Sequence, residues 1–218
     1  PAMTQAPQQT FRVQVLGCRV NHAERREIEA VLLSRGLTEA PSGAAADLEI
    51  VHTCGVTGRA AAKSRLAIRQ ARRTQTTQAT TLITGCLTGT DPAQAEELTD
   101  EHTIAFDRQL PVPQAVAQWI DARSGPAPHL PPLESSANGP PTTIPLPIAA
   151  LPSRLAHHIR AEVHIQDGCD AHCTFCIIPR GRPTLRSKRV DAVVREVSRL
   201  VELGHQEIVL TGIFLGAY

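Results

Sequence analysis

The run LEIVHTCGVT (residues 48–57) decides the fold class, because it passes from an apolar strand through a Cys-Gly turn into a helix-like segment. Two other runs have the same character, FRVQVLGC (residues 11–18) and TLITGC (residues 81–86). In each run a β-prone apolar stretch leads to a cysteine that adjoins a glycine. We therefore expect three equivalent strand-to-helix turns in one α/β domain.

The segments around these runs alternate between strand and helix. Strands are predicted at residues 11–16, 48–51, 80–83 and 103–106. Helices are predicted between Asn21, as a cap paired with Glu24, and Gly36, and at residues 57–73, 91–101 and 113–122. This alternation is typical of βαβ units in a doubly wound parallel sheet, whose right-handed crossovers place all strand C-termini at one edge.

Proline divides the chain into three parts. Most of the 17 prolines lie between residues 111 and 152. We expect an N-terminal domain at 11–124, a Pro-rich extended linker at 125–158 and a second α/β unit at 159–218. The second unit has a strand at 161–165, a helix at 190–203 and a strand at 207–210. This is the first βαβ part of a (β/α) barrel, which takes about 250 residues when complete, so the chain is expected to be a truncated fragment that is inactive alone.

Three of the six cysteines follow the predicted strands of the N-terminal domain. Cys18, Cys54 and Cys86 each lie in a loop at a strand C-terminus, where open α/β sheets gather ligands. Three thiolates at one edge match an iron–sulfur cluster with one iron free of protein ligands. A single cysteine of this kind is more often a buried core thiol, but three in equivalent loops favour the cluster.

The other three cysteines form one short loop, Cys169-Asp-Ala-His-Cys173-Thr-Phe-Cys176. Their spacing suits a second iron–sulfur cluster with an open iron. The alternatives are a zinc site with His172 as fourth ligand and a redox pair of Cys173 with Cys176. No second pair of ligands follows in the chain, which favours the cluster over zinc.

Bulk composition excludes several classes of protein. With 42% hydrophobic residues the chain is not disordered throughout, and no run approaches the roughly 20 apolar residues of a membrane span. Residues 1–10 lack the features of a signal peptide, so we expect a cytoplasmic protein with no membrane partner. The net charge of +1 leaves any nucleic-acid footprint to local patches. Two acid-free basic runs supply candidates for RNA contacts: Arg65, Arg69, Arg72, Arg180, Arg182 and Arg186.

The ordered motifs resemble those of the radical S-adenosylmethionine methylthiotransferase family. The matching stretches are LGCRVNHAE, ADLEIVHTCGVT, AAAKSR, TGCL, DGCDAHCTFCIIPRGR, LRS and EIVLTG. The resemblance implies two 4Fe-4S clusters, an auxiliary one on Cys18, Cys54 and Cys86, and a radical-SAM one on the other three cysteines. It also implies S-adenosylmethionine as cofactor, with Phe175 near its adenine, and an electron donor such as flavodoxin or ferredoxin.

The resemblance also bears on the substrate. LGCRVN and LTGIFLGAY are most similar to the subfamily that acts on threonylcarbamoyladenosine beside the tRNA anticodon. The alternatives are the enzymes for isopentenyladenosine in tRNA and for an aspartate of a ribosomal protein. Outside this family, a zinc-stabilised RNA-binding module and a thiol redox protein remain. Three departures from the family pattern stand out: His52 before Thr53, Pro183 after Arg182, and the run FDRQL at residues 106–110.

Overall fold

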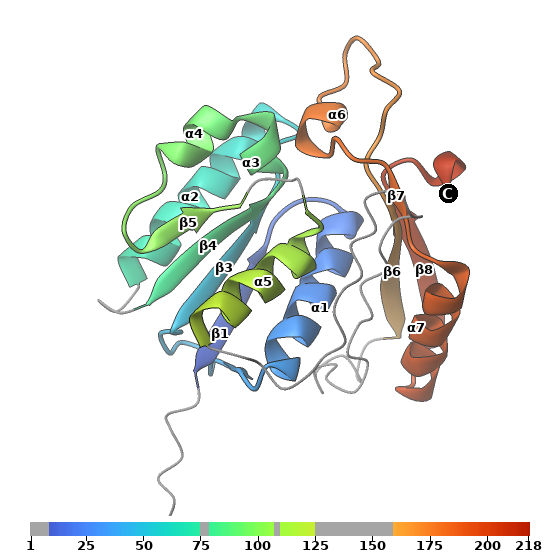
Figure 1. The fold of residues 1–218 in the computed structure, drawn as a ribbon, viewed down its shortest axis with the longest axis horizontal. Helices are drawn as coiled ribbons and strands as arrows, with labels where there is room; N and C mark the ends of the chain where they lie inside the picture. The colour runs from blue at the N-terminus through green and yellow to red at the C-terminus, as the bar shows by residue number, and fades with distance from the viewer. Residues whose placement is uncertain (1–8, 75–78, 107–109, 125–158) are drawn as a thin grey trace, which may run out of the picture.

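The computed structural model describes residues 9–74, 79–106, 110–124 and 159–218. The predicted linker at 125–158 and the centre of the FDRQL run, residues 107–109, lie outside the described residues. Within the described parts, the elements fall into two units that pack against each other (Figure 1).

The first unit is built on five parallel strands in the order β2-β1-β3-β4-β5 (Figure 1). The strands are β1 (Thr10–Val15), β2 (Thr38–Glu39), β3 (Leu48–Thr53), β4 (Thr80–Gly85) and β5 (Thr103–Ala105). The predicted doubly wound parallel sheet is therefore confirmed. Because the strand order reverses between β1 and β3, the crevice beside their C-terminal ends is the usual ligand position in such sheets.

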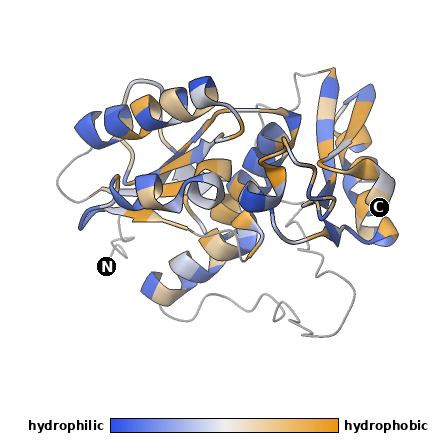
Figure 2. Cartoon of the chain, turned by 90° about the horizontal axis from the view of Figure 1, so that it is seen from above, coloured by the Kyte–Doolittle hydropathy of each residue, from blue (hydrophilic) through white to orange (hydrophobic). Residues whose placement is uncertain are grey.

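Helices cover both faces of this sheet (Figures 1 and 2). They are α1 (Arg19–Ser34), α2 (Gly58–Thr74), α3 (Cys86–Thr90), α4 (Pro92–Glu96) and α5 (Val112–Ser124). Successive side chains of a strand point to opposite faces of the sheet. Ile50 of β3 therefore packs in the core beneath α1 and α5, and its neighbour Val51 packs in the core beneath α2 and α3. Both side chains are fully buried, as is expected of a strand between two helical layers.

The second unit has three strands in the order β7-β6-β8. Its elements are β6 (Arg160–Asp167), α6 (Ile178–Gly181), β7 (Arg186–Ser187), α7 (Val190–Glu202), β8 (Glu207–Gly212) and the 3-10 helix η3 (Leu215–Ala217). Strands β6 and β8 are parallel, so the predicted βαβ part is present, and Val163 and Leu200 lie at its core. The antiparallel pairing of β7 with β6 was not predicted, and the barrel itself stays a prediction.

Two local predictions were wrong. The helix predicted at 91–101 starts as expected, with Asp91 as the N-cap of α4, but it ends at Glu96, and the short helix α3 directly after β4 was not predicted. The Asp91 carboxylate accepts a hydrogen bond from the backbone N–H of Gln94 at 3.2 Å. Helix α1 begins earlier than predicted, with Cys18 and not Asn21 at its N-cap.

Helix α1 lies between the two units and is buried on several faces. Its apolar residues, such as Ile28 and Leu32, enter the core of the first sheet. Its charged residues Glu24 and Glu27 are also buried, and they face residues of the second unit. A helix charged along one side is ordinarily solvated there, but here that side is covered by the second unit.

A cluster of charges joins α1 to the second unit. The Lys188 ammonium lies 2.8 Å from a Glu27 carboxylate oxygen and 2.7 Å from one of Glu196. Burial opposes the ionisation of Glu27, but Lys188 and the nearby His164 lower the pKa of Glu27 to about 2. Burial and the charge of Glu27 raise the pKa of Glu196. The ammonium of Lys188 thus pairs with two carboxylates. Glu27 stays ionised to a lower pH than Glu196.

We predict that this cluster makes stability depend on acid pH. The folded pKa of Glu27 lies below its ordinary value of 4.5, so its contribution is present above pH 4.5 and is lost as the pH falls towards 2. The shift corresponds to roughly 3 kcal/mol, which the opposite shift of Glu196 reduces. In urea unfolding at pH 6 to 2, Glu27→Gln should be less stable than the parent at pH 6 and approach it near pH 2.

Glu202→Gln is the matched control, because Glu202 is 63% exposed in its ion pair with Arg199. The stability of this variant should run parallel to that of the parent across the range. If stability falls in parallel with pH in the parent and in Glu27→Gln, the lowered pKa of Glu27 does not contribute to the stability of the protein.

Candidate metal centres

The first three cysteines lie at the C-terminal edge of the first sheet, as predicted. Cys18 caps α1 after β1, Cys54 follows β3, and Cys86 opens α3 after β4. The strands that carry them are direct neighbours, with Val15 opposite His52 and Thr53 opposite Gly85. Two of the three cysteines therefore flank the point between β1 and β3 where the strand order reverses.

Glycines allow the three cysteine loops to approach one another closely. A Cβ atom on Gly17 would lie 2.9 Å from the Cβ of Cys54 and 3.3 Å from its sulfur. A Cβ on Gly55 would lie 2.9 Å from the Cα of Leu87, beside Cys86. Gly85 has φ +93°, and a Cβ there would lie 2.6 Å from the backbone nitrogen of Thr53. Residues with side chains would push these loops apart.

The three thiols differ in their surroundings. Cys18 is exposed, whereas Cys54 and Cys86 are buried. Burial raises the pKa of Cys54, and the nearby Cys86 and Cys18 raise it further, against the effect of the Val56 backbone N–H. Thiols that favour the protonated form when alone become metal ligands only when a cation offsets the cost of deprotonation.

A single zinc ion would require its sulfur ligands to lie close together. Zinc binds thiolate sulfur at about 2.3 Å, so the sulfurs of one site lie within about 4 Å of one another. Among the residues that the structure describes, the set of three potential ligands within 4.8 Å of one another is Glu24, His164 and Asp167, and it includes no cysteine. Neither cysteine set is therefore drawn together at the spacing of a single ion in this structure.

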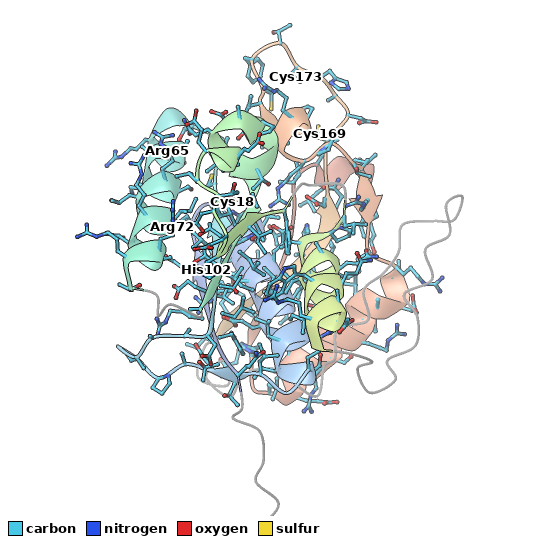
Figure 3. All side chains as sticks on the ribbon, turned by 60° about the vertical axis from the view of Figure 1, so that its left-hand side comes forward. Cys18, Arg65, Arg72, His102, Cys169 and Cys173 are labelled. Carbon is cyan, nitrogen blue, oxygen red and sulfur yellow. The ribbon has the colours of Figure 1, made fainter. Side chains whose placement is uncertain are left out.

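The second cysteine set lies on the loop between β6 and α6, above the first sheet (Figure 3). Cys173 is exposed, while Cys169 and Cys176 are half-buried. The backbone N–H of Cys176 donates to the carbonyl of Cys173 at 3.0 Å, which curls the end of the loop. Phe175, expected near a bound adenine, is 90% exposed at this loop.

Contact between α3 and α6 joins the two cysteine sets. A Cβ on Gly89 would lie 2.7 Å from the carbonyl oxygen of Arg180, and one on Gly181 would lie 3.5 Å from the Cβ of Cys86. The helix that starts at Cys86 therefore packs on the helix that follows Cys176 (Figure 1). The linkage of the two sets through small residues was not predicted, because it depends on contacts between distant segments.

Arg182 is the largest fully buried side chain at this junction. Its Nε donates to the sulfur of Cys86 at 3.3 Å. Its two terminal nitrogens donate to Asn21, Glu24 and Asp167. Although burial favours the neutral form, the charges of Glu24 and Asp167 raise the pKa of Arg182 well above its ordinary value. The prediction that Arg182 contacts RNA is wrong, because its guanidinium is enclosed and already paired.

His52, one of the three departures from the family pattern, belongs to the same network. Its Nδ1 lies 2.9 Å from the Thr84 hydroxyl, and its Nε2 lies 3.0 Å from the Glu24 carboxylate. The predicted pairing of Asn21 with Glu24 as a helix cap is also wrong. The Asn21 amide instead donates to the carbonyls of Leu16 and Thr53, which ties α1 to the ends of β1 and β3.

The remaining basic side chains divide by their exposure. Arg65 and Arg72 both lie on α2 (Figure 3). Arg65 donates to Gln94 at 2.5 Å, and Arg72 pairs with Asp100. Arg186 is half-buried on β7. Arg69 and Arg180 are exposed, and α2 adds further exposed basic residues, namely Arg59, Lys63 and Arg73. The accessible basic surface is therefore centred on α2, with Arg180 beside the second cysteine loop.

No helix in the described parts of the chain is both long enough and apolar enough to span a membrane.

Comparisons with known proteins agree with the motifs. Residues 10–107 match the family described as "Uncharacterized protein family UPF0004". A threonylcarbamoyladenosine tRNA methylthiotransferase of Bacillus subtilis is 32% identical, and the alignment covers 96% of this chain and 44% of that protein. A tRNA-2-methylthio-N(6)-dimethylallyladenosine synthase of Zymomonas mobilis is 29% identical over 93% of this chain and 43% of its own length. A ribosomal protein uS12 methylthiotransferase of Thermus thermophilus is 31% identical over 93% and 42%.

The predicted resemblance to the methylthiotransferases is thus confirmed along nearly the whole chain. The chain spans about half the length of the curated relatives it matches.

The close approach of the cysteine loops leads to a prediction about Gly85. Gly85→Ala should strongly destabilise the protein in urea unfolding, because the new methyl group meets the backbone of Thr53 and φ is +93°. Gly36→Ala is the matched control, since Gly36 also has positive φ, +81°, but a Cβ there meets nothing within 4 Å. The control should lose only about 1–2 kcal/mol of stability, which is the cost of placing a side chain in the left-handed conformation. Equal losses in the two variants would contradict the close approach.

Proposed function

Because this chain is similar to methylthiotransferases over nearly its whole length, we propose that it holds two iron–sulfur clusters and acts in the methylthiolation of tRNA. The observation that carries the proposal is the pair of three-cysteine sets on loops joined by α3 and α6. A zinc-stabilised RNA-binding module or a thiol redox protein needs neither two such sets nor their packing against each other.

Each cysteine set has a distinct place in the proposed reaction. Cys169, Cys173 and Cys176 hold the radical-SAM cluster, and Cys18, Cys54 and Cys86 hold the auxiliary one. When bound, the first cluster supplies an electron for radical chemistry with S-adenosylmethionine, and the second supplies the sulfur. The buried Cys54 and Cys86 keep water from one side of the auxiliary site, while the exposed Cys18 leaves its other side open.

The proposed substrate is the threonylcarbamoyl-modified adenosine beside the tRNA anticodon. Several relatives that carry this name are 28–32% identical to the chain, and LGCRVN at residues 16–21 supports the same subfamily. The alternatives act on dimethylallyladenosine or on a ribosomal protein. Nucleoside analysis of tRNA from a strain that lacks the gene tests the proposal: loss of the methylthio group from threonylcarbamoyladenosine alone supports it, and its persistence contradicts it.

Other parts of the proposal rest on the resemblance. Phe175 is exposed where an adenine can stack on it. An electron donor such as flavodoxin or ferredoxin and a cytoplasmic location stay predictions.

We predict that anaerobic reconstitution of the chain yields about eight iron and eight sulfide per molecule, four of each for every cubane. Replacing Cys169, Cys173 and Cys176 together by Ala should leave about four of each, and so should replacing the other three. Two zinc ions without sulfide would support the RNA-binding module instead.

A second prediction concerns the basic surface of α2. Arg69→Glu with Arg73→Glu should weaken the binding of a tRNA transcript and lower the slope of log K against log salt by up to about 1.8. These side chains are exposed and four residues apart on one helix face. Arg195→Glu with Arg199→Glu on α7 makes the same change of charge where acids already pair with both arginines. This control should keep the parent slope, and equal slopes for both double variants would contradict a role of α2.

A further inference from the structure

Arg182 belongs to one cysteine loop but acts on the other. It directly follows α6, and its carbonyl accepts a hydrogen bond from the N–H of Cys169 at 3.3 Å. Its side chain crosses to the first unit, where Nε lies 3.3 Å from the sulfur of Cys86. The backbone of one residue thus contacts one candidate cluster loop while its side chain contacts a ligand atom of the other.

The position of this guanidinium is fixed on every side. Nη1 donates to Glu24 and Asp167, and Nη2 donates to Asn21 and Glu24. Glu24, His164 and Asp167 have the spacing of a cation site, and the two carboxylates of this set already pair with a cation in Arg182. A planar fork with several N–H donors fits these partners, whereas a lysine ammonium is a single point of charge and cannot reach all of them.

The positive charge of Arg182 is more than offset locally. Glu24 and Asp167 lie on opposite sides of the interface, and their two carboxylates face one guanidinium. Glu24 is also held by His52, so it cannot swing away. At the sulfur of Cys86 itself, Arg182 contributes a directional N–H···S hydrogen bond. Hydrogen bonds to ligand sulfurs are among the factors that set the potential of an iron–sulfur cluster.

We propose that Arg182 is a positioning residue that orients Cys86 and raises the reduction potential of the auxiliary cluster through its N–H···S bond. This proposal rests on the proposed function. Because the same residue is bonded to Cys169 through its backbone, a shift of the radical-SAM loop acts on the N–H···S bond. The auxiliary site therefore responds to the conformation of the loop on which S-adenosylmethionine would bind.

The test measures the auxiliary cluster alone in the full chain. The parent carries Ala at positions 169, 173 and 176, so that four iron per chain remain. Redox titration followed by electron paramagnetic resonance gives the midpoint potential. Arg182→Met should lower the ratio of reduced to oxidised cluster about tenfold at a fixed potential, which is about 59 mV for one electron. Arg182→Lys, which keeps the charge but loses the fork, should give an intermediate shift.

Arg180→Met is the matched control, because Arg180 lies two residues away and is exposed. It should leave the potential unchanged. If Arg182→Met does not fold or does not hold four iron, Arg182→Lys provides the second variant. It keeps the positive charge but loses the Nε–H donor to the sulfur of Cys86, so it should still lower the potential.

The outcomes separate the two proposals. A parent that holds no four-iron cluster would overturn the proposed function and this inference together. A parent with an intact cluster whose potential is the same in Arg182→Met would overturn only the role of Arg182. An Arg182→Lys variant with an unchanged potential would do the same.

Discussion

The structure depends on the burial of one positive charge. A guanidinium removed from water is tolerated only when every donor finds a partner, and Arg182 finds its partners on two units at once. Glu24, Asn21 and Cys86 come from the first unit, and Asp167 comes from the second. Removing one partner of such a buried pair typically costs about 3–5 kcal/mol. The interface between the units is therefore part of the folded state of each.

Helix α1 makes this arrangement possible because it serves two surfaces with different chemistry. Its apolar residues pack on the first sheet through ordinary hydrophobic burial. On its other side, Glu24 pairs with Arg182 and Glu27 pairs with Lys188, one helical turn apart. Ion pairs supply less net energy than apolar contacts but are more selective in geometry. They hold the second unit in one register against the strand ends that carry the cysteines.

Local patterns predicted much of the fold. Three apolar runs followed by cysteine and glycine were enough to place Cys18, Cys54 and Cys86 at one sheet edge, because strand direction and crossover hand are general rules. The burial of Arg182 between the two units was not predictable from local patterns. An acid-free run suggests a solvated basic patch, but the acids that pair with Arg182 include Glu24, 158 residues earlier. For the same reason His52 looked like an isolated departure, although it supports Glu24.

The burial of Arg182 also changes where exposed positive charge is found on the molecule. With Arg182 enclosed, and Arg65 and Arg72 bonded within the protein, the exposed positive charge lies on α2 and at Arg180. Cys54 and Cys86 are closed off by the contacts around Gly17, Gly55 and Gly181, which leaves the Cys18 side of the edge accessible. The second cysteine loop, with exposed Cys173 and Phe175, projects beyond the same edge (Figure 3). On the proposed function, an RNA steered by the basic charge of α2 would approach the edge at which Cys18 and the second cysteine loop are exposed.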